Sequence, residues 1–196
     1  MHGLINRSIQ CFLRDTYGVA TWDAVAREAG LGFAGFEAML TYPTELTDRI
    51  IDAAALILHH TRPSVLEDLG TYLVSHQNLE ALRRLLRFGG VNFADFLNSL
   101  EELPERGRLA VPDLDLPDLE LRDHPGGKYT LRCRGNIEGV GHVMVGLLRA
   151  MADDYGALVV LDFLGSGGGA EVIDIHLLDQ SFNEARPFAL GQRAGA

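Results

Sequence analysis

The hydrophobic periodicity of the sequence changes at about residue 100, and this change limits the folds open to the chain. Up to about residue 100, apolar residues recur every three or four positions, as on one face of an α-helix. After Pro104, apolar and polar residues alternate, as in Leu119-Glu120-Leu121-Arg122, which is typical of a half-buried strand. A helical pattern returns only over 139–155. The sequence therefore predicts an α+β fold with a helical front half and a β-β-α-β-β back half.

The front half predicts several amphipathic helices. The first covers residues 2–17 and is followed by Gly18, a natural helix stop. A short helical piece is expected over 33–40, and further helices run from Thr44 to the residues before Pro63 and on to about residues 86 and 100. Pro104 is expected to end the helix that begins near Phe93, because proline disrupts a helix interior.

The back half predicts two hairpins. His124-Pro125-Gly126-Gly127 joins the first pair of strands, and the glycine run 165–169 joins the second pair, 158–164 and 172–178. The glycine run lacks the lysine and the following helix of a phosphate-binding loop. We expect one domain over residues 1–180, made of a helical subdomain (1–62) and a mixed α/β subdomain (63–180), followed by a tail over 181–196.

Composition excludes several classes of function. The 196 residues are 47% hydrophobic, enough for a substantial core, and carry a formal charge of −10, which argues against a nucleic-acid partner. The only tight basic cluster, Arg83, Arg84 and Arg87, is predicted to be a solvated helix face. No apolar run approaches the roughly 20 residues that a membrane span needs. Two cysteines, outside any CxxC pair, favour a reducing, cytoplasmic setting without membrane partners.

The sequence also argues against an enzyme. It contains no HExxH or GxSxG motif and no Cys-His pair with a positioned acid. The neighbouring acids Glu101-Glu102 and Asp153-Asp154 are expected on solvated helix faces, because adjacent helical residues point about 100° apart.

Seven blocks of the sequence stand out together: Met1 to Arg7, Asp15 to Gly18, Thr21 to Asp23, Leu69-Gly70, Leu82 to Gly90, Phe93 to Leu100 and Gly139 to Leu148. In order and spacing they resemble the H-NOX family (haem nitric oxide/oxygen binding, also called HNOB), which includes the sensor half of soluble guanylate cyclase. The resemblance implies a gas-sensor fold that binds haem and a diatomic gas such as nitric oxide. It also implies signalling partners such as a histidine kinase or a cyclic-dinucleotide enzyme.

The resemblance breaks at the residues that hold haem in the family. The window Leu100-Glu101-Glu102-Leu103-Pro104 puts Pro104 at the position of the iron-ligating histidine, and proline offers no lone pair to iron. The family's Tyr-x-Ser-x-Arg propionate clamp corresponds to Cys133-Arg134-Gly135-Asn136-Ile137. Arg132 or Arg134 could still bind a carboxylate through a guanidinium fork. Ile5 and Pro117 match positions that pack on the porphyrin in relatives.

Two hypotheses follow. In the first, the chain is a stand-alone sensor or regulatory module that binds haem through a substitute ligand, for which His142 and His76 are the candidates. In the second, the chain keeps the fold without haem and acts as a regulatory scaffold or binds another apolar ligand. Loss of both the ligand and the clamp favours the second hypothesis.

Overall fold

The computed structural model describes residues 1–180, so the predicted tail over 181–196 lies outside the described residues. Two short 3₁₀ turns, η1 (Gln77–Leu79) and η2 (Leu100–Glu102), accompany the helices and strands. The helices are α1 (Gly3–Tyr17), α2 (Val19–Glu28), α3 (Thr44–Leu58), α4 (Arg62–Ser75), α5 (Glu80–Arg87), α6 (Phe93–Asn98), α7 (Leu103–Ala110) and α8 (Val140–Tyr155). The strands are β1 (Asp118–His124), β2 (Lys128–Arg134), β3 (Leu158–Gly167) and β4 (Ala170–Asp179).

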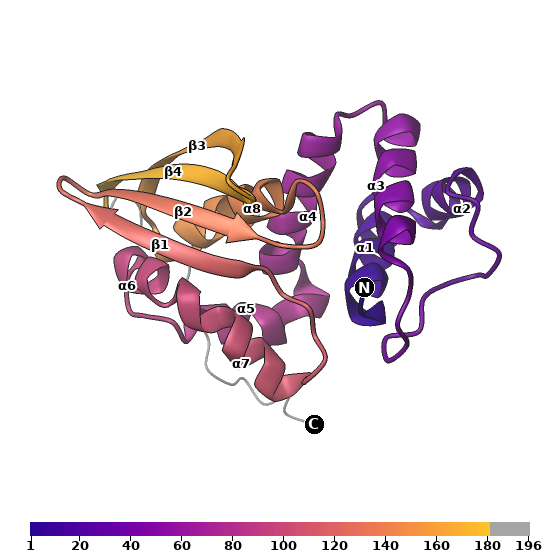
Figure 1. The fold of residues 1–196 in the computed structure, drawn as a ribbon, viewed down its shortest axis with the longest axis horizontal. Helices are drawn as coiled ribbons and strands as arrows, with labels where there is room; N and C mark the ends of the chain where they lie inside the picture. The colour runs from indigo at the N-terminus through magenta and orange to yellow at the C-terminus, as the bar shows by residue number, and fades with distance from the viewer. Residues whose placement is uncertain (181–196) are drawn as a thin grey trace, which may run out of the picture.

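The first four helices pack around one hydrophobic cluster (Figure 1). The predicted apolar face of α1 supplies Ile9, Phe12 and Leu13, all buried. The helix begins where the His2 imidazole accepts a hydrogen bond from the Leu4 N–H, and it ends at Gly18, whose φ of 91° favours glycine. The prediction for residues 2–17 is confirmed to within one residue.

The back half forms one antiparallel sheet in the order β1-β2-β4-β3, with α8 packed against its inner face (Figure 1). Strands β1 and β2 form one hairpin, and β3 and β4 form the other. Inward-facing residues such as Leu131, Ile173 and Ile175 are fully buried, and they build a second hydrophobic cluster with α6 and α8. The predicted helical front half and β-β-α-β-β back half are therefore confirmed.

Helices α4 and α8 lie at the boundary of the two hydrophobic clusters, and their backbones pack in close contact. A Cβ atom at Gly70 would collide with the Val143 carbonyl, and one at Gly146 would collide with the Glu67 carbonyl. Glycine is required at both positions because the two backbones meet there. Residues of α4 contribute to both hydrophobic clusters.

Three local predictions were wrong. Pro104 begins α7 instead of ending the preceding helix, which stops at Asn98, because proline fits the first helical turn where no N–H partner is needed. Pro63 likewise lies in the first turn of α4, which is capped by the Thr61 side chain. Residues 33–40 form bends and turns, held in part by the Phe36 N–H bonded to the Gln10 side chain.

Within residues 1–180, no helix is long and apolar enough to cross a membrane.

Candidate functional site

Pro104, at the position that the resemblance assigns to the iron ligand, is buried in the first turn of α7. The segment that follows α7 packs directly on this helix, since a Cβ atom at Gly107 would collide with the Leu116 side chain. The proline ring has no donor atom for a metal. Position 104 therefore serves the packing of α7.

His142 is held inside the protein by groups from two other elements. Its Nδ1 lies 3.3 Å from Oε1 of Glu67 on α4, and its ring stacks on Phe163 of β3 with centroids 4.0 Å apart. The other oxygen of Glu67 accepts two hydrogen bonds from Arg149, each 3.2 Å. The imidazole therefore ties α8 to α4 and β3.

His76 caps α4 and lies against the first helix. Its ring packs on Tyr72 with centroids 4.7 Å apart, and its Nδ1 is 3.8 Å from Asp15 Oδ2. The Tyr72 hydroxyl donates to the same carboxylate oxygen across 2.7 Å. Burial, assisted by this hydrogen bond, raises the pKa of Tyr72. His76 belongs to the α1–α4 contact and lies on a different element from His142.

The two candidate arginines lie on the outer face of the sheet. Their guanidinium groups approach Oε2 of Glu120 on β1, at 3.8 Å for Arg132 and 3.6 Å for Arg134. Hydrogen bonds from Arg122 hold the pKa of Glu120 below its usual value. Cys133, between the two arginines, points inward and is buried. The arginines thus form a surface charge cluster on the face opposite α8.

Ile5 and Pro117 belong to different parts of the fold. Ile5 is half-buried against the N-terminal helical cluster. Pro117 precedes β1, and its Cβ would be 3.3 Å from a Cβ atom added at Gly135. The structure therefore distributes the six predicted site residues over the helical front half, the α8 N-terminus, the segment before β1 and the outer face of the sheet.

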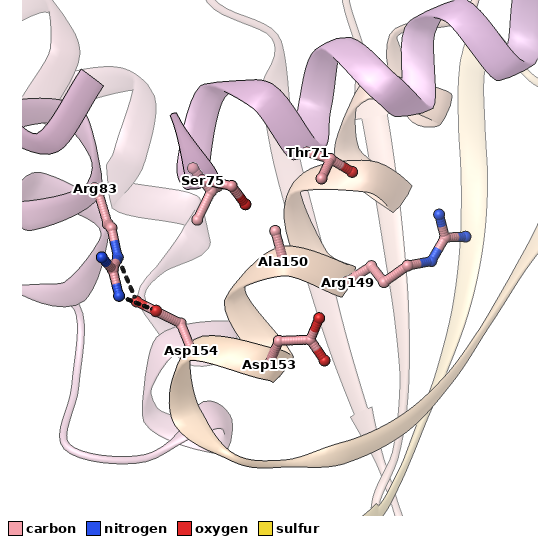
Figure 2. Close-up of a pocket in the computed structure, with 8 residues that line it drawn as sticks. Thr71, Ser75, Arg83, Arg149, Ala150, Asp153 and Asp154 are labelled. Atoms are coloured by element: carbon pink, nitrogen blue, oxygen red, sulfur yellow. Dashed lines mark hydrogen bonds and ion pairs between the residues drawn. The ribbon is translucent and has the colours of Figure 1, made fainter. Parts of the chain in front are cut away.

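A pocket of about 90 Å³ lies between α4, α5 and α8 (Figure 2). The Arg83 guanidinium on its rim binds the Asp154 carboxylate through two hydrogen bonds.

The expectation that Asp153-Asp154 is a solvated face was wrong for Asp154, which is 3% exposed. The predicted solvated basic cluster is also wrong for Arg87, whose guanidinium lies 4.0 Å above the Tyr155 ring. Tertiary packing of α5 on α8 satisfies these charges.

A second pocket, of about 140 Å³, lies beside the start of α8. Glu171 of β4 fills the anion-binding position there, because its carboxylate accepts hydrogen bonds from the N–H groups of Gly139 (2.7 Å) and Gly141 (2.6 Å). Sequence reasoning missed Glu171. Glu171 directly precedes the strand predicted over 172–178, and no local pattern indicates that it meets the start of α8.

These residues do not fit a haem group. Haem iron needs an axial donor, and Pro104, at the position that the resemblance assigns to that donor, supplies none. The imidazoles of His142 and His76 are each stacked on an aromatic ring and face a carboxylate. The two pockets lie below the roughly 300–1,000 Å³ of cofactor sites. In the described part of the chain, no group of three His, Cys, Asp or Glu side chains could hold a metal ion.

The helical front half joined to a helix and a four-stranded antiparallel sheet defines the H-NOX fold. An H-NOX protein from S. oneidensis has the same fold, with a TM-score of 0.77 at 16% identity over 92% of this chain and 97% of that one. An H-NOX protein from K. algicida has a TM-score of 0.75 at 17% identity, covering 91% and 97%. Residues 2–162 match the Haem-NO-binding family, and the chain belongs to this family.

Curated relatives are soluble guanylate cyclases. The chain is 25% identical over 165 residues to soluble guanylate cyclase gcy-31 of Caenorhabditis elegans, which covers 84% of this chain. It is 21% identical over 160 residues to soluble guanylate cyclase 89Da of Drosophila melanogaster, covering 82%. In both cases the match spans 24% of the relative, so the chain spans about a quarter of the length of these cyclases.

Proposed function

We propose that this chain is a regulatory module of the Haem-NO-binding family that works without haem. The observation that carries the proposal is Pro104, which the resemblance places at the iron-ligand position and which is buried in the first turn of α7. A proline cannot supply the axial donor on which haem sensing depends. Such a module acts through its protein contacts, with residues 1–180 as one folded unit.

The region that corresponds to the propionate clamp supports the same proposal. Cys133 packs in the core, and Arg132 and Arg134 face Glu120 on the outer face of the sheet. The start of α8, where backbone N–H groups could hold a carboxylate from a ligand, is already occupied by Glu171.

A regulatory rather than a catalytic role agrees with this arrangement. The titratable groups described above are engaged in packing or in ion pairs that connect helices. The partner we propose is a separate signalling protein, such as a histidine kinase or a cyclic-dinucleotide enzyme, as the resemblance implies.

A second candidate function is a haem sensor for nitric oxide with His142 as a relocated iron ligand. One observation favours it: His142 lies in the first turn of α8, at the helix start that borders the pocket of about 140 Å³. In this function the imidazole must leave both Glu67 and Phe163 to reach iron.

A haem titration of the purified protein separates the two functions. Absorption spectra of the ferrous form are recorded with and without nitric oxide for wild type, His142→Ala and His76→Ala. Our proposal expects weak, unsaturable uptake that is the same in all three proteins. A sharp Soret band that saturates at one haem per chain and shifts with nitric oxide would contradict it. Loss of that band in one variant would then identify the ligand.

A further inference from the structure

The two edges of the sheet differ in how the rest of the chain covers them. The strand order leaves β1 and β3 as edge strands (Figure 1). At β1, the turn η2 packs alongside, and the Leu121 N–H donates to Oε1 of Glu101 across 2.8 Å. Edge strands expose unpaired N–H and C=O groups that can pair with another chain. The β1 edge is protected from such pairing.

Within residues 1–180, no segment covers the β3 edge in the way that η2 covers β1. Within residues 1–180, β3 forms its strand hydrogen bonds with β4 alone. The strand is ten residues long and contains no lysine or proline, the residues that commonly block edges, and Asp162 is its only charge. Two apolar side chains of β3 are exposed: Val160 at 45% and Leu164 at 64%.

The hydrophobic core is also incomplete on the β3 side. The inward-facing residues Val159, Leu161 and Phe163 pack against the core but are only partly buried. Their neighbours on β4, Ile173 and Ile175, have no exposed surface. A further strand beside β3 would cover Val159, Leu161 and Phe163 and so extend the hydrophobic core.

Irregularities in β3 limit where a new strand can pair. The register with β4 shifts between Leu158 and Val159 and again between Phe163 and Gly165. Bulges of this kind end regular pairing. The regular part of the edge therefore runs from Val159 to Phe163, with Leu161 at its centre.

We propose that β3 pairs antiparallel with β3 of a second copy of this chain about a two-fold axis at Leu161, which joins the two sheets. This register uses the whole regular segment and places Val159 opposite the partner's Phe163. It also places Asp162 opposite the partner's Val160, so that the two Asp162 carboxylates are diagonal neighbours and do not oppose each other directly. A two-fold axis at Asp162 would instead oppose two carboxylates. Isologous two-fold dimers are the commonest oligomers, and the interface does not depend on whether haem binds.

Sedimentation velocity over a concentration series tests the proposal with matched variants. Val160→Asp puts a carboxylate opposite the partner's Asp162 at two places, and we expect dimerisation to weaken about tenfold, equivalent to about 1.4 kcal/mol. The control Leu56→Asp makes a similar change at a side chain of α3 that is 60% exposed and belongs to the helical front half, and it should leave dimerisation unchanged. Circular dichroism verifies that both variants are folded.

Disulfide trapping tests the register independently. In a Cys11→Ser background, Leu161→Cys brings two thiols together at the axis, where paired strands keep Cα atoms about 4.5–5.5 Å apart, within disulfide range. We expect a covalent dimer under mild oxidation, and none for Leu121→Cys at the protected β1 edge. A wild type that stays monomeric at every concentration, with no Leu161→Cys dimer, would overturn the proposal. Cross-linking that begins only after deletion of 181–196 would also overturn it, since the chain's own C-terminal segment would then be the occupant.

Discussion

Arg83 on α5 neutralises the buried carboxylate of Asp154 on α8, with Nε 2.9 Å from Oδ2 and a second hydrogen bond from the same guanidinium (Figure 2). Asp154 would be an uncompensated charge in the protein without this partner. The pair therefore fixes α5 against the last turn of α8, next to Tyr155, whose hydroxyl lies within hydrogen-bond distance of two carbonyls, those of Gly90 (3.1 Å) and Arg87 (3.3 Å).

Removal of one partner of this ion pair should lower the free energy of unfolding more than removal of both partners. Arg83→Met leaves the Asp154 carboxylate unpaired, and we expect a loss of about 3 kcal/mol in the free energy of unfolding, measured by urea denaturation at neutral pH. Arg83→Met combined with Asp154→Leu should recover most of the loss, because no buried charge remains. Equal losses in the single and double variants would show that the ion pair has no such role.

The close contact between α4 and α8 should not tolerate a methyl group. Gly70→Ala pushes a Cβ atom into the Val143 carbonyl, so we expect a loss of about 1–3 kcal/mol in urea denaturation. Gly32→Ala is the matched control, since nothing lies within 4 Å of its added Cβ. The control should stay within about 0.5 kcal/mol of wild type. A neutral Gly70→Ala would mean that the helices can separate at no cost.

The carboxylate at the start of α8 should contribute to stability. Glu171→Gln removes the charge that the two N–H groups of Gly139 and Gly141 bind, and we expect a loss of about 1–2 kcal/mol. Thermal unfolding monitored by circular dichroism measures it. Glu138→Gln, an exposed carboxylate beside the same helix start, is the control and should change stability little. Similar effects for the two variants would contradict a specific role for Glu171.

The buried thiol of Cys133 should make stability fall at alkaline pH. Burial, assisted by the nearby Glu171 charge, raises the pKa of Cys133 to about 12. The folded state therefore keeps a proton that the unfolded state loses at its ordinary value of about 8.5–9. The contribution of the Cys133 thiol to the free energy of unfolding is fully present below pH 8.5. It then declines by about 1.4 kcal/mol per pH unit up to about pH 12.

Comparison with Cys133→Ala isolates this contribution, because tyrosines also titrate in the same range. The stability difference between wild type and Cys133→Ala should shrink as the pH rises from 9 towards 11. A difference that stays constant over this range would contradict a raised thiol pKa. In the folded protein at pH 8, a thiol reagent should modify the half-buried Cys11 before Cys133.

Local periodicity was sufficient to predict most of the elements. The apolar stripe that includes Ile9 and Phe12 predicts α1 because helical spacing depends on the residues themselves, and the alternation in β1 predicts a strand for the same reason. Proline was misread at Pro104 and Pro63, because its effect depends on whether it falls in the first turn of a helix or in its interior. Where the proline falls depends on where the helix begins, and the local sequence indicates the N-terminal end of a helix only weakly.

The sequence by itself determined the fold class, the family and the residue at position 104, since these depend on periodicity, motif order and side-chain chemistry. The tertiary structure decided the partners of each charged or aromatic group. It brings Glu67 to His142, Arg83 to Asp154 and Glu171 to the start of α8, from sequence separations of 30 to 75 residues. Such pairs form only when packing brings distant elements together, and no local pattern encodes them.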